Sequence, residues 1–251
     1  MTKSKLTRGL ITVGAVCVWL VLWEILAAVI NLDFILPGFF TTAAELFTVL
    51  KEGSSYLYLT LSFLRIASGF VLGVLCGIGL AFLTRYSRVA RAMLSPVMTV
   101  VRTTPVASFI MVLWLLIGSD AVPTVISAIM VAPIVWQNLD EGFLAIDKDL
   151  DEVCKIYSVS PKKRMKILVI PTLVKYLIPS ILTSAGLAWK AGIAAEIISY
   201  TSNSIGKEIY LAKAYFESGK MFAWTIIVIF LSLLIENIIK LLKKHLLSEG
   251  E

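Results

Sequence analysis

Long, nearly uncharged apolar runs constrain this chain more than any other feature of its sequence. Six such runs occur in the 251 residues, at 10–30, 59–83, 93–117, 121–139, 170–198 and 221–242. A bilayer core about 30 Å thick needs about 20 apolar residues per helix, so each run is long enough to cross a membrane. With 58% hydrophobic and 16% charged residues, the chain has little left for a soluble domain. The sequence therefore predicts an all-α polytopic membrane protein with about six transmembrane helices.

Basic residues fall almost entirely into alternate gaps between these runs. One side receives the lysines and arginines of residues 3–8, 85–91, 148–166 and 240–244, whereas the other receives only Lys51, Lys207, Lys213 and Lys220. The positive-inside rule places the richer side, and with it both termini, in the cytoplasm of a bacterial or archaeal cell. The net charge of +6 is thus interpreted as a topology signal, and nucleic acid is not expected as a partner.

The runs also suggest how the chain is divided. Residues 1–57 are expected to form an uncleaved first membrane helix and an external loop, because the first run is too long for a signal peptide. Residues 58–245 form the main transmembrane domain, and residues 246–251 a cytoplasmic tail. In the second run Gly69, Gly73 and Gly77 recur every four residues, which predicts a smooth face for close helix packing.

The segment from Asp147 to Pro171 is the longest cytoplasmic loop, and its pattern is helical. An apolar stripe of period 3.6 runs through Leu150, Val153, Cys154 and Tyr157. Asp149 as N-cap and Glu152 three residues later fit a capping box. Ser160 and Pro161 then suit the start of a second short helix. Two short helices joined by a tight turn would present an apolar stripe flanked by charge, which favours docking into a groove of another protein.

This loop resembles the EAA loop of bacterial ABC-importer permeases. That pattern is Glu-Ala-Ala, a glycine six positions after the glutamate, and an ending of hydrophobic-x-x-hydrophobic-Pro. The matching residues here are Glu152-Val153-Cys154, Ser158, Ile167 and Ile170-Pro171, with Val-Cys in place of Ala-Ala and Ser158 in place of glycine. The resemblance implies a coupling element seated in an ATPase, and it assigns that role to Leu150, Glu152, Val153, Tyr157, Ser158, Ile167 and Pro171.

A wider resemblance, carried by residues 62–70, 102–107, 113–114 and 188–196, is to the nitrate, sulfonate, taurine and bicarbonate branch of these permeases. That branch includes transporters of thiamine-precursor pyrimidines. The resemblance implies the type I ABC importer fold in a lipid bilayer and a small polar solute. It also implies a second permease copy in a homodimer, ABC ATPase subunits that carry ATP and magnesium, and an external solute-binding protein.

Four charged residues, Arg65, Arg102, Lys190 and Glu196, lie within or at the edges of the apolar runs. A charge facing lipid costs roughly 2.5–3.5 kcal/mol on insertion scales, so each is expected to face protein, water or the interface. Arg65 and Glu196 are interpreted as ion-paired or as reaching to the membrane surface. Two cations and neighbouring hydroxyls on one passage would suit a small anionic or strongly polar solute better than a cation. The predicted pathway residues are Arg102, Thr103, Thr104, Trp189, Lys190 and Glu196.

Other classes fit the sequence less well. An ion- or proton-coupled secondary transporter is the alternative, but no repeat of the first half is evident in the second, and the coupling-loop pattern would be unexplained. The sequence has no Gly-x-Ser-x-Gly pattern that would support an enzyme. It also lacks the Gly-x-x-x-x-Gly-Lys-Ser/Thr loop that binds ATP, so ATP hydrolysis is expected in a separate chain. Cys17, Cys76 and Cys154 are widely spaced and are expected as free thiols, and His245 lies in the basic tail. No metal or cofactor is expected in this chain.

Overall fold

Every regular element of the described chain is helical. The computed structural model describes residues 2–248, and it describes the side chains of residues 11–241. Residues 249–251 of the expected tail lie outside the described chain, whereas residues 246–248 continue the last helix. The elements are α1 (Thr2–Ile30), α2 (Phe39–Lys51), α3 (Gly53–Tyr86), α4 (Arg88–Thr103), α5 (Val106–Ile117), α6 (Val122–Leu144), α7 (Lys148–Ile156), α8 (Pro161–Arg164), a π-helical turn (Met165–Val169), α9 (Ile170–Ser199), α10 (Ile205–Ala214) and α11 (Ser218–Ser248).

Five helices are long and apolar enough to cross a membrane, and a sixth crossing is split. The five are Ile11–Ile30, Gly53–Tyr86, Val122–Leu144, Pro161–Ser199 and Ser218–Leu241. The helices α4 and α5 pass the same test together but meet at an angle of 105°. The expected third span, 93–117, is therefore divided between two helices. Pro105 is the reason, because a proline lacks the N–H that would continue α4 and holds the preceding Thr104 in extended backbone.

The segment predicted as an external loop contains a helix that sequence reasoning missed. Residues 39–51 form α2, and α3 begins at Gly53 instead of residue 59. Glu24, the single charge of the first apolar run, explains how α2 is held. Its Oε2 accepts a hydrogen bond of 2.7 Å from the backbone N–H of Phe39, the first residue of α2, where the helix dipole favours an anion. Trp23 adds a hydrogen bond from its Nε1 to the carbonyl of Pro37, at 3.1 Å.

The core of the bundle is formed by α3, α6 and α9. The glycine ridge of α3 lies directly against α6: a Cβ on Gly69 would come within 2.2 Å of the Thr124 carbonyl oxygen. A Cβ on Gly73 or Gly77 would come within 2.7 Å of the Val131 or Val135 Cβ. The prediction that this ridge serves helix packing is confirmed, because only a residue without a side chain permits this approach.

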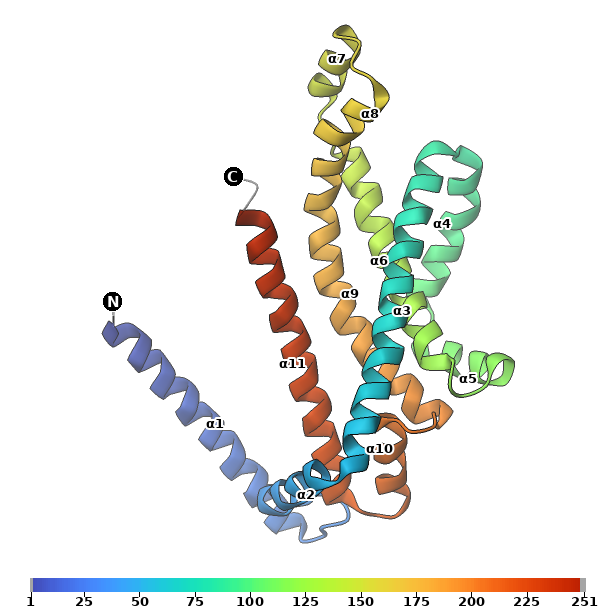
Figure 1. Ribbon diagram of the computed structural model, residues 1–251. Helices are drawn as coiled ribbons and strands as arrows, with labels where there is room; N and C mark the ends of the chain where they lie inside the picture. The colour runs from blue at the N-terminus through green and yellow to red at the C-terminus, as the bar shows by residue number, and fades with distance from the viewer. Residues whose placement is uncertain (1, 249–251) are drawn as a thin grey trace.

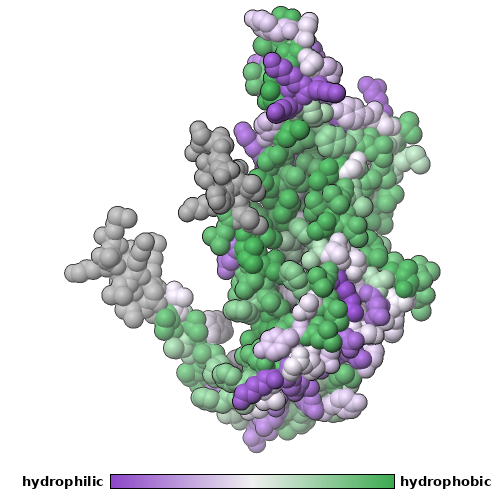
Figure 2. All heavy atoms as spheres, viewed as in Figure 1, coloured by the Kyte–Doolittle hydropathy of each residue, from purple (hydrophilic) through white to green (hydrophobic). Residues whose placement is uncertain are grey.

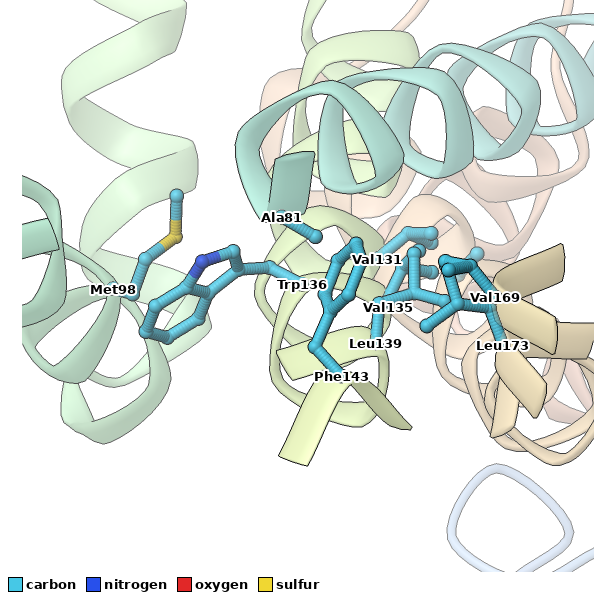
Figure 3. Close-up of a cluster of buried hydrophobic side chains, with 10 residues drawn as sticks. Ala81, Met98, Val131, Val135, Trp136, Leu139, Phe143, Val169 and Leu173 are labelled. Atoms are coloured by element: carbon cyan, nitrogen blue, oxygen red, sulfur yellow. The ribbon is translucent and has the colours of Figure 1, made fainter. Parts of the chain in front are cut away.

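Apolar side chains fill the space around this contact (Figure 3). Trp136 of α6 lies among them, and its Nε1 donates a hydrogen bond of 3.0 Å to Thr84 Oγ1 of α3, which satisfies the indole donor inside the core. The buried cluster comprises Ala81, Met98, Val131, Val135, Trp136, Leu139, Phe143, Val169, Leu173 and Ala188. In α6, 56% of the membrane-spanning segment is buried inside the protein, against 6% in α1, so α6 is the central helix and α1 is peripheral.

The two ends of the bundle differ in charge. Figure 1 shows the α3–α4 turn and the α7–α8 loop at one end, with α2 and α10 at the other. The described start of α1 and the described end of α11 point toward the α7–α8 end. Figure 2 shows an apolar band between two polar ends. The basic residues are therefore sorted as the sequence predicted: Arg85, Arg88 and Arg91 share an end with the α7–α8 loop.

Candidate functional site

The loop between α6 and α9 folds into a short helix, α7, with a polar cap. Asp147 is the N-cap, and its Oδ1 accepts hydrogen bonds from the backbone N–H groups of Asp149 and Leu150, at 2.9 and 3.1 Å. The expected capping box of Asp149 and Glu152 is wrong by two residues, because the side chain of Asp147 reaches these donors first. Glu152 is consequently not used for capping. Its side chain is exposed and has no hydrogen bond or ion pair within the described residues.

A tight turn ends α7, and Ser158 is its pivotal residue. Ser158 has φ 48°, in the left-handed region that a glycine adopts without strain. Its N–H bonds to the Lys155 carbonyl at 3.0 Å, and the N–H of Val159 bonds to the Cys154 carbonyl at 2.9 Å. These are the two hydrogen bonds of a Schellman motif. The turn is therefore complete even though a serine carries the strained conformation.

Ser158→Gly is expected to stabilise this turn by about 1 kcal/mol, because the left-handed region costs an L-residue roughly 1–2 kcal/mol and glycine returns part of this as unfolded-chain entropy. Hydrogen exchange of the α7 amides in the full chain should slow about fivefold. The matched control is Ser160→Gly, where φ is −58° and glycine relieves no strain. Equal or faster exchange in Ser158→Gly than in the native chain would contradict this account of the turn.

An ion-pair network fixes α7 to the chain that follows it. Asp151 accepts from Arg164 Nε at 2.5 Å and lies 3.0 Å from Lys155 Nζ. The Arg164 guanidinium, and after it the Lys155 ammonium, hold the pKa of the Asp151 carboxyl below its usual value. The network joins residues 13 positions apart in sequence, so it holds the two arms of the loop together.

The second arm differs from the expected second short helix. Pro161 is at the first helical position, as predicted, but the Ser160 side chain makes no capping hydrogen bond. After Arg164 the chain continues through a π-helical turn, Met165–Val169, directly into α9. The N–H of Ile170 bonds to the Met165 carbonyl five residues back. Pro171 gives the physical reason, because it has no N–H and its ring crowds the carbonyl four residues before it, at Ile167.

The outer face of α7 is apolar and uncovered. Leu150 is 52% exposed, Val153 46%, Ile156 76% and Tyr157 77%, whereas Cys154 is buried. The sequence stripe thus splits: Cys154 faces the protein, and the other members face outward. Ile156 was missed, because it falls outside the strict helical spacing. We refer to Leu150, Val153, Ile156 and Tyr157 as the α7 apolar face. Of the remaining loop residues predicted from the resemblance, Ile167 is 53% exposed and Pro171 is exposed at the start of α9.

Arg102 and the two threonines lie at the break between α4 and α5. Arg102 Nη1 donates to Gln137 Oε1 of α6, and Gln137 Nε2 donates to Glu141 Oε1 at 3.0 Å. The hydroxyl of Thr103 donates to the Thr99 carbonyl at 3.0 Å, and that of Thr104 donates to the Val100 carbonyl at 2.7 Å. These protons are bound within α4, so the hydroxyls present only acceptor lone pairs outward.

Lys190 and Trp189 lie on α9 and differ sharply in environment. Trp189 is 2% exposed and donates from Nε1 to the Val228 carbonyl of α11 at 3.1 Å, so it packs inside the protomer. Lys190 is exposed and lines a cavity of about 470 Å³ between α9 and α11. Arg102 instead pairs with α6. Within one protomer, therefore, the structure does not bring the two predicted cations together.

Glu196 is fully buried, so the expectation that it reaches the membrane surface or forms an ion pair is wrong. Its Oε2 accepts from Ser62 Oγ at 2.8 Å and from the N–H of Gly206 at 3.1 Å, at the start of α10. Ser62 Oγ also accepts from the N–H of Ile205, at 3.0 Å. Gly206 is required here, because a Cβ would come within 2.3 Å of the Glu196 Cβ. Glu196 thus ties α3, α9 and α10 together, and α10 itself was not predicted.

Arg65 lies inside α3, not at its end. Arg65 Nη1 donates to the carbonyl of Asn203 at 3.3 Å, in the loop before α10. Neither Arg65 nor Glu196 has an ion-pair partner within 4.0 Å among the described residues.

A helical bundle with five to six candidate spans and a folded helical loop between α6 and α9 is the architecture of a multi-pass membrane protein. Residues 69–248 match the family model described as the inner membrane component of binding-protein-dependent transport systems. This match covers more than half of the chain, and the chain belongs to this family.

Relatives give the same picture. The chain is 25% identical over 85% of its length to SsuC of Bacillus subtilis, named an aliphatic sulfonates transport permease, and covers 78% of it. It is 27% identical over 78% of its length to the nitrate import permease NrtB of Synechococcus elongatus, and covers 74% of it. A crystal structure of an amino acid ABC transporter matches the fold with a TM-score of 0.61 at 16% identity, covering 76% of this chain and 94% of that one.

Proposed function

We propose that this permease forms the membrane pathway of an ATP-driven importer and that its α7–α8 loop transmits the action of a separate ATPase. The α7 apolar face is the observation that carries the proposal. It is exposed on a helix that Asp147, the Ser158 turn and the Asp151–Arg164 pair hold in a fixed conformation. A rigid amphipathic helix suits a hydrophobic groove on a partner protein.

The partners are part of the same proposal, and membership of the family supports an ATPase and a binding protein in general terms. An external binding protein delivers the solute, two ATPase subunits hold ATP and magnesium, and a second copy of this chain completes a homodimer. This chain contributes no nucleotide site, because no phosphate-binding Gly-x-x-x-x-Gly-Lys-Ser/Thr loop occurs in its sequence. The Glu152 carboxylate, unpaired beside the α7 apolar face, is proposed to fix the loop in the ATPase.

The solute is proposed to be a small polar anion of the sulfonate or nitrate type, with a thiamine-precursor pyrimidine as the other solute that the resemblance allows. The names of the relatives support an anion. Arg102 and Lys190 are proposed to lie along the pathway, each on its own side of the bundle. The Thr103 and Thr104 oxygens accompany Arg102, whereas Trp189 and Glu196 support the pathway from the core.

Sidedness tests this proposal. The α7–α8 end and both termini are proposed to face the cytoplasm, because the arginines and lysines concentrate there. In a background without native cysteines, a thiol at Lys163→Cys should react with impermeant reagent only from the inside, and one at Lys213→Cys only from the outside. Both side chains are exposed, at opposite ends of the molecule. Labelling of Lys163→Cys from outside in intact cells would refute coupling through this loop.

A further inference from the structure

The cavity between α9 and α11 gathers polar groups from two membrane-spanning helices. Thr183, Gly186 and Lys190 of α9 and Glu236 and Lys240 of α11 line it together with two leucines, around a volume of about 470 Å³. Ionisable groups at membrane depth are costly and mark solute or ion routes. None of the α11 residues was assigned a role by the sequence.

The cavity carries more positive than negative charge. Lys240 Nζ lies 3.5 Å from Glu236 Oε2, one helical turn away, so the carboxylate has its cation on its own helix. Glu236 also lies against α9, because a Cβ on Gly186 would be 3.6 Å from its Oε1. Lys190 has no hydrogen bond or ion pair within the described residues. Two ammonium groups and one carboxylate leave one positive charge, and it resides on Lys190.

The position of Lys190 in the membrane favours a transported solute over a lipid headgroup as the occupant of the cavity. Lys190 lies about 14 Å along the helix from Ser199, inside the span Pro161–Ser199, whereas Lys240 lies next to the last residue of the span Ser218–Leu241, so the cavity reaches from the membrane interior toward the basic end. A side chain on a helix leans toward the N-terminal end, so Lys190 and the α11 residues lean toward each other. Phosphate headgroups remain at the interface, whereas a transported anion must pass this depth.

We propose that this cavity is the binding site for the charged group of a transported monoanion, with Lys190 as its cation. Lys240 is a positioning residue that holds Glu236 away from Lys190. The inference rests on the proposed function, since it treats the permease as an importer, and it adds the site and the charge of the solute. The Glu236–Lys240 pair then sets specificity: without Lys240, the Glu236 carboxylate would neutralise Lys190.

Thiol chemistry tests this without knowledge of the solute. A thiol at Thr183→Cys, in the full-length chain without native cysteines and in phosphatidylcholine vesicles, is treated with a sulfonate-bearing and with a trimethylammonium-bearing thiosulfonate. The anionic reagent should react faster. Lys190→Met should lower the ratio of the two rates roughly tenfold, as expected for loss of one nearby charge at an intermediate dielectric constant. Millimolar methanesulfonate or nitrate should slow the reaction of the thiol with the anionic reagent when Lys190 is unchanged.

A charge-balance series makes the test specific. Lys240→Gln should lower the ratio as Lys190→Met does, because Glu236 is then free to pair with Lys190. Adding Glu236→Gln to Lys240→Gln should restore it, because Lys190 alone again supplies one positive charge. Lys175→Met, an exposed lysine of α9 outside the cavity, is the matched control and should change nothing.

Three results would overturn the inference. The first is no reaction of the thiol with either reagent, which would mean that water does not reach the cavity. The second is a ratio of the two reaction rates that Lys190→Met leaves unchanged. The third is a thiol that is protected from the anionic reagent only when the vesicles contain anionic phosphatidylglycerol, which would identify a lipid headgroup as the occupant. Because the assay needs no ATPase, any of these leaves the importer proposal to be judged separately by ATP-driven uptake.

Discussion

Tyr157→Asp should weaken binding of the ATPase at least about thirtyfold and stop coupled transport, while the permease still folds and inserts. Tyr157 is 77% exposed at the end of the α7 apolar face, so the folded chain does not need it. In a docked complex, a tyrosine buried at the interface can be worth about 2 kcal/mol or more, and an aspartate would also place a charge in an apolar groove. Co-purification and the affinity of the purified subunits give the measurement.

The control for Tyr157→Asp is Tyr215→Asp. Tyr215 is 71% exposed and lies at the opposite end of the molecule. It therefore matches Tyr157 in residue type and exposure but lies away from the proposed ATPase contact. ATPase binding should be unchanged by Tyr215→Asp and reduced by Glu152→Ala, which removes the unpaired carboxylate of α7. Normal ATPase binding and uptake by both Tyr157→Asp and Glu152→Ala would show that α7 is not the coupling element.

Gly69→Ala should destabilise the bundle by about 1–3 kcal/mol, the usual cost of overpacking a well-packed site. The added methyl group would meet the Thr124 backbone oxygen at 2.2 Å, and a backbone atom cannot move aside as a flexible side chain can. The thermal unfolding midpoint in detergent, followed by tryptophan fluorescence, should fall accordingly.

Gly79→Ala is the matched control in the same helix. A Cβ on Gly79 meets nothing within 4 Å, and alanine is favoured over glycine in a helix by about 1 kcal/mol. The two variants should therefore shift the unfolding midpoint in opposite directions. Equal midpoints for Gly69→Ala and Gly79→Ala would contradict the α3–α6 contact.

Much of the fold was predictable because membrane spans and close helix contacts leave strong signals. Apolar length located the spans, and the four-residue spacing of Gly69, Gly73 and Gly77 located the α3–α6 contact. The break into two helices at 105° beside Pro105 was not predicted, since a proline in a membrane helix either bends or breaks it, and the neighbouring helices decide which. α2 and α10 were missed for a related reason: such short helices are held by tertiary contacts, here from Glu24 and Glu196.

In the loop and among the charged residues, too, local features were predictable from the sequence, and features that depend on distant residues were not. The left-handed backbone of Ser158 agrees with the glycine that the resembled pattern has at this position, so the serine did not change the turn. The cap shifted from Asp149 to Asp147, since two aspartates competed and sequence alone does not rank them. The fate of Glu196 depended on Ser62, 134 positions away, and the surroundings of Lys190 on Glu236 and Lys240 of another helix. Such long-range pairs leave no periodic signal in a single sequence.

ATP-driven transport by the reconstituted complex tests the central claim most directly. The permease, its ATPase and the external binding protein are placed in vesicles with the α7–α8 end outward, the binding protein inside and ATP added outside. The account predicts that labelled sulfonate or nitrate, loaded inside with the binding protein, moves to the α7–α8 side only with ATP and the ATPase, and that the isolated permease hydrolyses none. Transport driven by an ion gradient without ATP, or hydrolysis by the permease alone, would contradict the account.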